Sequence, residues 1–151
     1  MIYILAGIFA LLGLYNLFLS SKLKVRVVLT SVDLFVFAMI ILMFFIYQYV
    51  FKADYIKALT ISLSILFWNY SAIIARGFSE DKVFSNKLNP FVNKSVNLDE
   101  IKSVTLSRAK GRLLAIVYFR SSNVEDYMRF KLRNEKELIQ ILKKQRVNVI
   151  N

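Results

Sequence analysis

The stretch "KGRLLAIVYFRSSNVEDYMRFKLRNEKEL", residues 110–138, decides the fold of the C-terminal half of the chain. Residues 112–120 are apolar at almost every position, which is typical of a central strand covered on both faces. Residues 127–133 instead alternate apolar and basic side chains, the pattern of a half-buried strand. A shift of one residue would bury the basic side chains, so the alternation fixes the register. The expected inward side chains are Met128, Phe130 and Leu132, and the expected outward ones are Arg129, Lys131 and Arg133.

The residues that follow, "NEKELIQILKKQ" at 134–145, predict a helix that closes over this sheet. Asn134 is a favourable N-cap residue, and Glu137 stands at the N3 position of a capping box. Basic residues near the other end suit the negative end of the helix dipole. The apolar stripe that covers the sheet is expected to consist of Leu138, Ile141 and Leu142.

Upstream of residue 110 the chain contains further strand signals. Residues 78–85 and 90–98 are weak strand candidates joined by a turn-rich segment, and 98–101 suggests a single helical turn. Residues 102–108 predict a strand, and the Lys110–Gly111 pair that follows favours a tight hairpin connection to the next strand. Together these signals predict a small antiparallel sheet with one C-terminal helix.

The N-terminal half has the composition of a membrane-spanning region. Residues 1–21 carry no charge, and no signal-peptide pattern accompanies them, so we expect a retained first span. A helix needs about 20 mostly apolar residues to cross ~30 Å of hydrocarbon. Three segments meet this requirement, at residues 2–20, 31–51 and 57–75. The short connection between the second and third segments predicts a tight antiparallel hairpin.

Charge divides the chain into two parts and predicts an orientation. Residues 1–75 carry a net charge of +3, and the rest of the chain carries +8 of the total of +11. Residues 20–26 contain three basic and no acidic residues, whereas 52–57 contain two basic and one acidic residue. The positive-inside rule therefore predicts an outside N-terminus and a cytoplasmic C-terminal part. We expect a multi-pass protein of the cell (inner or plasma) membrane, with a three-span domain at 1–76 and an α+β domain at 77–151.

Residue types that carry much of enzyme chemistry are missing from the sequence. The chain has no cysteine and no histidine, which excludes disulfides, thiolate nucleophiles, Ser-His-Asp triads and the usual zinc ligands. The acidic pairs at 80–81, 99–100 and 125–126 are interpreted as solvated turns rather than acid–base or metal-binding pairs. The four glycines are too scattered for a phosphate-binding loop. We expect no catalytic residue, no cofactor and no metal ligand, and no nucleic-acid partner, because no recognition motif accompanies the basic charge.

A constellation of basic residues is the leading candidate for a binding site. Three of them surround the predicted hairpin turn, and three lie on the outer face of the following strand beside an aromatic residue. These candidates are Arg108, Lys110, Arg112, Tyr127, Arg129, Lys131 and Arg133. One interpretation is contact with anionic lipid head groups or an acidic partner, at ~1 kcal/mol per residue near a charged leaflet. The other is an ordinary solvated face whose charge reflects cytoplasmic location.

Polar residues inside the predicted spans are few. Asp33 lies close to the cytoplasmic end of its span, where it is expected to pair with Lys24 or Arg26; a functional role for this ionisable group is the alternative. Asn16 and Asn69 are expected to join helices through hydrogen bonds, at ~0.6–2 kcal/mol each.

The C-terminal half resembles a known domain family. The phrases "EDKVFSN", "VNLDEIKSVTLSR", "LLAIVYFR" and "YMRFKLRNEKELIQILKK" follow the pattern L-x-E-I-x-x-V, a hairpin, and N-x-x-E-L before a helix. This pattern, over residues 77–146, resembles the bacterial pleckstrin-homology-like (PH-like) domain found in small bacterial membrane proteins. The resemblance implies an antiparallel sheet capped by a C-terminal helix, without catalytic residues. Some members of the family are associated with self-protection against bacteriocins, and others are thought to be scaffolds.

The sequence thus supports two hypotheses of different classes. The first is a non-enzymatic integral membrane protein whose PH-like domain mediates protein or lipid interaction, as an immunity factor against membrane-active bacteriocins or as an accessory scaffold. Its expected partners are membrane lipids, a membrane-active peptide or a larger membrane complex. The alternative is a small transporter or channel subunit that forms a homo-oligomer, with Asn16, Asn69 and the Ser and Thr residues of the third span at its interface.

Overall fold

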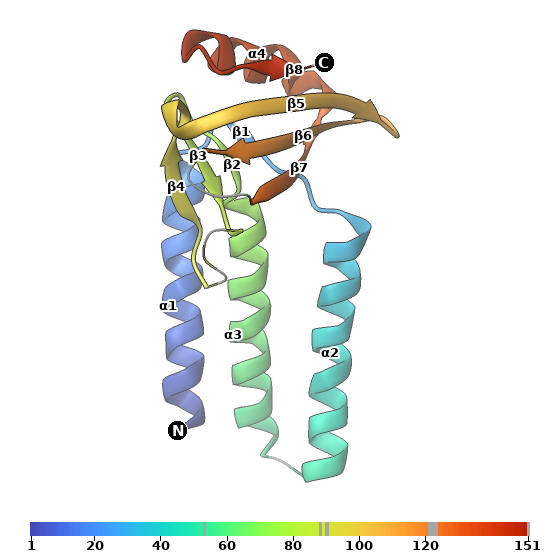
Figure 1. Ribbon diagram of the computed structural model, residues 1–151. Coiled ribbons are helices and arrows are strands. Elements are labelled where there is room, and N and C mark those ends of the chain that lie inside the picture. The colour runs from blue at the N-terminus through green and yellow to red at the C-terminus, as the bar shows by residue number, and fades with distance from the viewer. Residues whose placement is uncertain (53, 88, 90, 121–123, 151) are drawn as a thin grey trace.

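The computed structural model describes residues 1–52, 54–87, 89, 91–120 and 124–150. Within this part of the chain, three helices are long and apolar enough to cross a membrane. They are α1 (Ile2–Ser21), α2 (Ser31–Phe51) and α3 (Tyr55–Ile74). Their bounds agree with the predicted segments within two residues. The helices lie side by side, and the strands and the last helix gather at one end of them (Figure 1).

The close helix pair is α1 with α3. The rings of Phe9 and Trp68 lie 5.2 Å apart between centroids. Gly13 lies so near the Phe67 ring that a Cβ atom there would come within 2.4 Å of it, so the small residue permits the close approach. The second and third spans form the predicted antiparallel hairpin with a short connection, but α3 packs more closely against α1 than against α2 (Figure 1).

Helix α2 packs only loosely against its neighbours. No residue from 31 to 50 is buried inside the protein. Its ring contacts with α3 among the described residues include Phe37 with Tyr70, at 6.4 Å, and Phe44 with Tyr55, at 6.0 Å. Large aromatic side chains at these points keep the two backbones apart.

The strands form two four-stranded sheets in the part of the chain that the structure describes. The first contains, in spatial order, β1 (Val25–Arg26), β2 (Gly77–Phe78), β3 (Lys82–Ser85) and β4 (Lys94–Asn97), all antiparallel. The second contains β7 (Glu125–Lys131), β6 (Arg112–Phe119), β5 (Ile101–Ala109) and β8 (Val149–Ile150), with β8 parallel to β5. Short 3-10 turns at Leu98–Glu100 and Leu132–Asn134 precede β5 and α4 (Glu135–Lys144). The result is an α+β arrangement, as expected.

The core lies between the two sheets and α4. Leu113, Ala115 and Val117 on one face of β6 are fully buried, as are Met128 and Phe130 of β7. The predicted stripe of α4 joins the same apolar cluster. The other face of β6 carries Leu114, Ile116 and Tyr118, which are only half-buried. Strand β6 is central, but the expectation that both its faces are covered is wrong, because α4 and the first sheet share the same face.

The connection between α1 and α2 contributes to the α+β part. Val25 and Val27 belong to its core cluster, and β1 pairs with β2. Gly77 has φ +144° and lies against this connection, so a Cβ atom at Gly77 would come within 2.1 Å of the Val25 carbonyl oxygen. Only glycine fits this backbone conformation and this close approach. The sequence did not predict β1, because a two-residue strand has no periodicity of its own.

Candidate functional site

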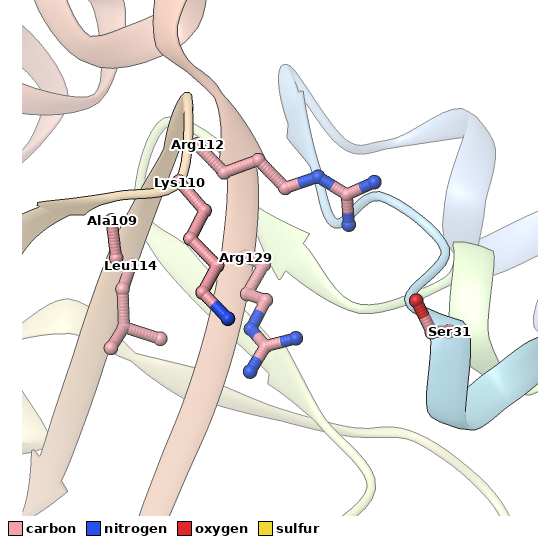
Figure 2. Close-up of a pocket in the computed structure, with 6 residues that line it drawn as sticks. All are labelled: Ser31, Ala109, Lys110, Arg112, Leu114 and Arg129. Carbon is pink, nitrogen blue, oxygen red and sulfur yellow. The ribbon is translucent and has the colours of Figure 1, made fainter.

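A cavity of about 420 Å³ lies between the β5–β6 hairpin, β7 and the N-terminal end of α2. Three of the predicted basic residues point into it, and none of the described residues that line it is acidic. Its lining residues are Ser31, Ala109, Lys110, Arg112, Leu114 and Arg129 (Figure 2). We call this cavity the basic cleft.

The hairpin turn and the strand register bring these side chains together. Lys110 and Gly111 have φ angles of 49° and 73°, so both adopt the left-handed conformation of a tight hairpin turn. Arg112 starts β6 directly after this turn. Leu114, two residues on, is paired with Arg129 of β7 and lies on the same face of the sheet. The predicted outward direction of Arg129 is confirmed, since it is exposed between two buried neighbours.

The connection between α1 and α2 positions Ser31, the first residue of α2, on the opposite wall of the basic cleft. The Val28 backbone N–H donates a hydrogen bond to the Arg129 carbonyl oxygen, at 2.8 Å. Arg112 donates from Nη1 to the Leu29 carbonyl oxygen, at 3.1 Å. These two bonds hold the connection along the open edge of β7. They therefore place the start of α2, with Ser31, opposite the three cations (Figure 2).

Asp33 caps α2 instead of forming an ion pair. The Thr30 N–H and hydroxyl donate to the Asp33 carboxylate at 2.6 and 2.7 Å, and the Asp33 N–H donates to the Thr30 hydroxyl at 3.3 Å. This is a capping box. The predicted pairing with Lys24 or Arg26 is therefore wrong, because the carboxylate turns back over the first turn of its own helix.

The remaining basic candidates lie away from the basic cleft. Lys131 and Arg133 line a second cavity, of about 500 Å³, together with Lys24 and Arg26. Lys24 forms an exposed ion pair with Glu80, and its hydrogen bond lowers the pKa of the Glu80 carboxyl. The structure thus places five of the seven predicted residues in two separate cavities.

Two further candidates are engaged with acidic neighbours. Arg108 donates from Nε to both carboxylate oxygens of Glu135, at 3.1 Å each, on the side of the hairpin that faces α4. The Tyr127 hydroxyl donates to Glu125 at 2.8 Å, and this hydrogen bond raises the pKa of Tyr127. Both side chains are exposed, but neither lines the basic cleft.

The end of β7 differs from its predicted form. The strand ends at Lys131, and Leu132 is 39% exposed on a 3-10 turn, so its expected inward direction is wrong. Arg133 lies on the same turn rather than on the strand. Because the turn leads directly into α4, Asn134 is already helical, with φ −85° and ψ −2°, and its side chain does not cap the helix. The predicted capping box with Glu137 is therefore wrong.

The asparagines of the apolar helices behave differently from the prediction. Asn16 is fully buried, and its Oδ1 accepts a hydrogen bond from the Asn93 backbone N–H, at 3.5 Å. Asn93 in turn donates from Nδ2 to the Ala72 carbonyl oxygen of α3, at 2.7 Å. Asn16 thus binds the connection between β3 and β4, not another helix. Asn69 is half-buried, and its side chain forms no hydrogen bond within the part of the chain that the structure describes.

A buried ion pair that the sequence did not predict supports the basic cleft. Arg76, which follows α3, is paired with the fully buried Asp126 of β7 and also donates to the Tyr127 carbonyl oxygen, at 3.0 Å. The Ser85 hydroxyl donates to the same carboxylate, at 2.5 Å. The interpretation of Asp126 as part of a solvated turn is therefore wrong. The same alternation that places Met128 and Phe130 inside also predicts a buried Asp126, provided that the strand is extended by two residues toward the N-terminus.

No protein-family model matches the chain, and no curated protein or solved structure matches it. Among the described residues there is no group of three or more acidic, histidine or cysteine side chains that could hold a metal ion. What the basic cleft can do chemically follows from its lining, which offers ammonium and guanidinium donors to an anion.

Proposed function

We propose that this protein is a non-enzymatic integral membrane protein whose basic cleft binds the anionic head groups of membrane lipids. In this proposal α1, α2 and α3 cross the membrane, the N-terminus is outside, and the α+β part is a PH-like domain in the cytoplasm. The observation that carries the proposal is the gathering of Lys110, Arg112 and Arg129 in one cavity at the end of three apolar helices.

The position of the cleft relative to the helices supports lipid as the ligand. Ser31 both begins α2 and lines the cleft, so the three cations lie at the level where an apolar helix ends. Hydrocarbon gives way to phosphate at that level in a bilayer. Each Lys or Arg near an anionic leaflet contributes ~1 kcal/mol, so three cations supply about 3 kcal/mol.

The surface beside the cleft has the matching apolar character. Leu114, Ile116 and Tyr118 form a half-buried apolar row on the same face of the sheet as Arg129. Apolar and aromatic side chains flanked by cations are typical of surfaces that lie in a membrane interface. The two antiparallel sheets with a C-terminal helix support a PH-like domain, with the parallel strand β8 as an addition to it. The scaffold and immunity roles implied by the resemblance stay predictions.

A pair of charge variants tests the proposal. The cleft variant carries Lys110→Gln, Arg112→Gln and Arg129→Gln. The remote variant carries Lys102→Gln, Lys136→Gln and Lys143→Gln, which are exposed positions on β5 and α4 that remove the same charge. The full chain in detergent is titrated with phosphatidylglycerol or phosphatidylcholine, and thermal unfolding is followed through the fluorescence of the single tryptophan, Trp68. Lipid that binds only the folded protein raises its stability in proportion to RT ln(1 + [L]/Kd).

We expect phosphatidylglycerol to stabilise the natural chain and the remote variant alike. In the cleft variant its Kd should rise about 100-fold, since about 3 kcal/mol corresponds to two powers of ten. The stabilisation by phosphatidylcholine should be similar in the natural chain and in both variants. Equal weakening in both variants would mean that net charge, not the cleft, attracts the lipid, and the proposal would then be wrong.

A further inference from the structure

An apolar cavity of about 540 Å³ lies between α2 and α3. Most of its lining comes from these two helices and includes Phe35, Met39 and Met43 of α2 and Ile61, Ser62 and Ile65 of α3; Ile2 of α1 also lines it. We call it the α2–α3 groove. It exists because α2 packs loosely, with none of its residues from 31 to 50 buried.

The α2–α3 groove continues the basic cleft along one face of α2. Ser31 lines the cleft and Phe35, one turn later, lines the groove. Residues spaced by four positions share one face of a helix, so the face of Ser31 continues through Phe35 and Met39. The groove follows α2 from Phe35 to Tyr47, about 18 Å at ~1.5 Å per residue. This length is close to the hydrocarbon of one leaflet, roughly half of ~30 Å.

A polar side chain of α3 lies beside the end of the groove that is nearer the cleft. Ser62, Ile65 and Asn69 follow the spacing of one helix face, so Asn69 lies on the groove side of α3. It is five residues before the end of α3, about 8 Å along the helix axis. Its amide forms no hydrogen bond among the described residues, so its donors are available to a ligand.

We propose that the protein holds one anionic diacyl glycerophospholipid, with its phosphate in the basic cleft and one acyl chain in the α2–α3 groove. Asn69 would donate to an ester carbonyl between the two. This inference rests on the proposed function. It adds that one lipid molecule is held in a defined site, whereas surface charge alone would attract lipids without holding a particular one. Charge complementarity selects this occupant. The protein presents cations, then an amide, then apolar side chains, and this order matches the phosphate, ester and acyl chain of such a lipid.

Two matched pairs of substitutions test the inference. The groove variant carries Met39→Trp and Ile65→Trp, which fill the cavity from both sides. Its control carries Leu42→Trp and Leu63→Trp, which are 48% and 55% exposed on other faces of the same helices. The full chain, purified in detergent, is titrated with dioleoyl phosphatidylglycerol and with the dihexanoyl form, and bound lipid is counted by native mass spectrometry. Elution as a monodisperse species and helical circular dichroism verify the fold of each variant.

We expect one dioleoyl phosphatidylglycerol to be retained by the natural chain and the control. In the groove variant its Kd should rise about tenfold or more, the equivalent of about two lost buried methylene groups. The dihexanoyl lipid has short acyl chains and therefore binds mainly through the cleft. Its weak affinity for the groove variant should differ less than about threefold from its affinity for the natural chain. The cleft variant should lose both lipids.

The outcomes separate the inference from the function it rests on. If the groove variant binds the dioleoyl lipid as its control does, while the cleft variant does not, the acyl chain lies elsewhere and the inference fails alone. If the cleft variant retains both lipids, the proposed function fails. If the natural chain is a dimer that the groove variant dissociates without changing lipid affinity, a second copy occupies the groove and the inference is overturned.

Discussion

Replacing Asp126 with alanine is expected to lower the free energy of unfolding by about 3–5 kcal/mol. The carboxylate is fully buried, and the Arg76 side chain with which it pairs is only 13% exposed. Removing the carboxylate therefore leaves a guanidinium in a poorly solvated place with no counter-charge. The Ser85 hydroxyl loses its acceptor in the same substitution.

The measurement is unfolding of the full chain in detergent, followed by Trp68 fluorescence. Asp99→Ala is the matched control, because Asp99 is an exposed aspartate of the same part and its loss should cost within about 0.5 kcal/mol. The double variant Arg76→Met with Asp126→Leu should recover most of the loss, since an apolar pair of similar volume replaces the buried charges. Similar small effects in Asp126→Ala and Asp99→Ala would contradict the buried pair.

The ion pair also has a consequence for the basic cleft. Arg76 comes two residues after the end of α3, and Asp126 lies on β7, the strand that carries Arg129. The pair therefore ties the end of an apolar helix to one wall of the cleft. We expect Asp126→Ala to weaken the binding of anionic lipid as well, although the substituted residue does not line the cleft.

Phe130→Ala is expected to cost about 3–5 kcal/mol of unfolding free energy. Phe130 is fully buried on β7, and its ring lies 5.9 Å from that of Phe78 on β2, so it joins the two sheets across the core. Truncation removes this apolar contact and leaves a cavity between layers that cannot fully collapse.

The control for Phe130→Ala is Leu132→Ala, two residues further on. Leu132 is 39% exposed on the 3-10 turn, so its truncation should cost less than about 1 kcal/mol in the same unfolding experiment. Comparable losses in the two variants would mean that the strand continues inward through Leu132, as the alternation alone predicts. The structure of this turn would then be wrong.

The parts of the fold that local signals specify were predictable from the sequence. Uninterrupted apolar runs identified the three helices, and two successive residues with positive φ, Lys110 and Gly111, form the predicted hairpin turn. The alternation in β7 fixed which side chains face the core between Met128 and Phe130. It could not show where the strand ends, since Leu132 continues the pattern while the backbone turns away.

Features that depend on distant parts of the chain were not predictable. Asp126 is separated by fifty positions from Arg76, and Asn16 by seventy-seven from Asn93. Strand β1 forms only because the connection between α1 and α2 packs against Gly77. The candidate site was not predictable for the same reason. The sequence pattern alone could not distinguish which of the basic residues lie in one cavity. Only the course of the α1–α2 connection along β7 separates the basic cleft from the cavity that contains Lys131 and Arg133.

Everything proposed for the basic cleft depends on its lying at the cytoplasmic end of three membrane-spanning helices. The chain contains no cysteine, so single substitutions give an unambiguous readout with a membrane-impermeant maleimide. Lys52, between α2 and α3, and Lys136, on α4, are both exposed and lie at opposite ends of the predicted spans. In intact cells we expect Lys52→Cys to be labelled at once and Lys136→Cys only after the membrane is permeabilised. Labelling of Lys136→Cys in intact cells, with Lys52→Cys protected, would contradict this orientation.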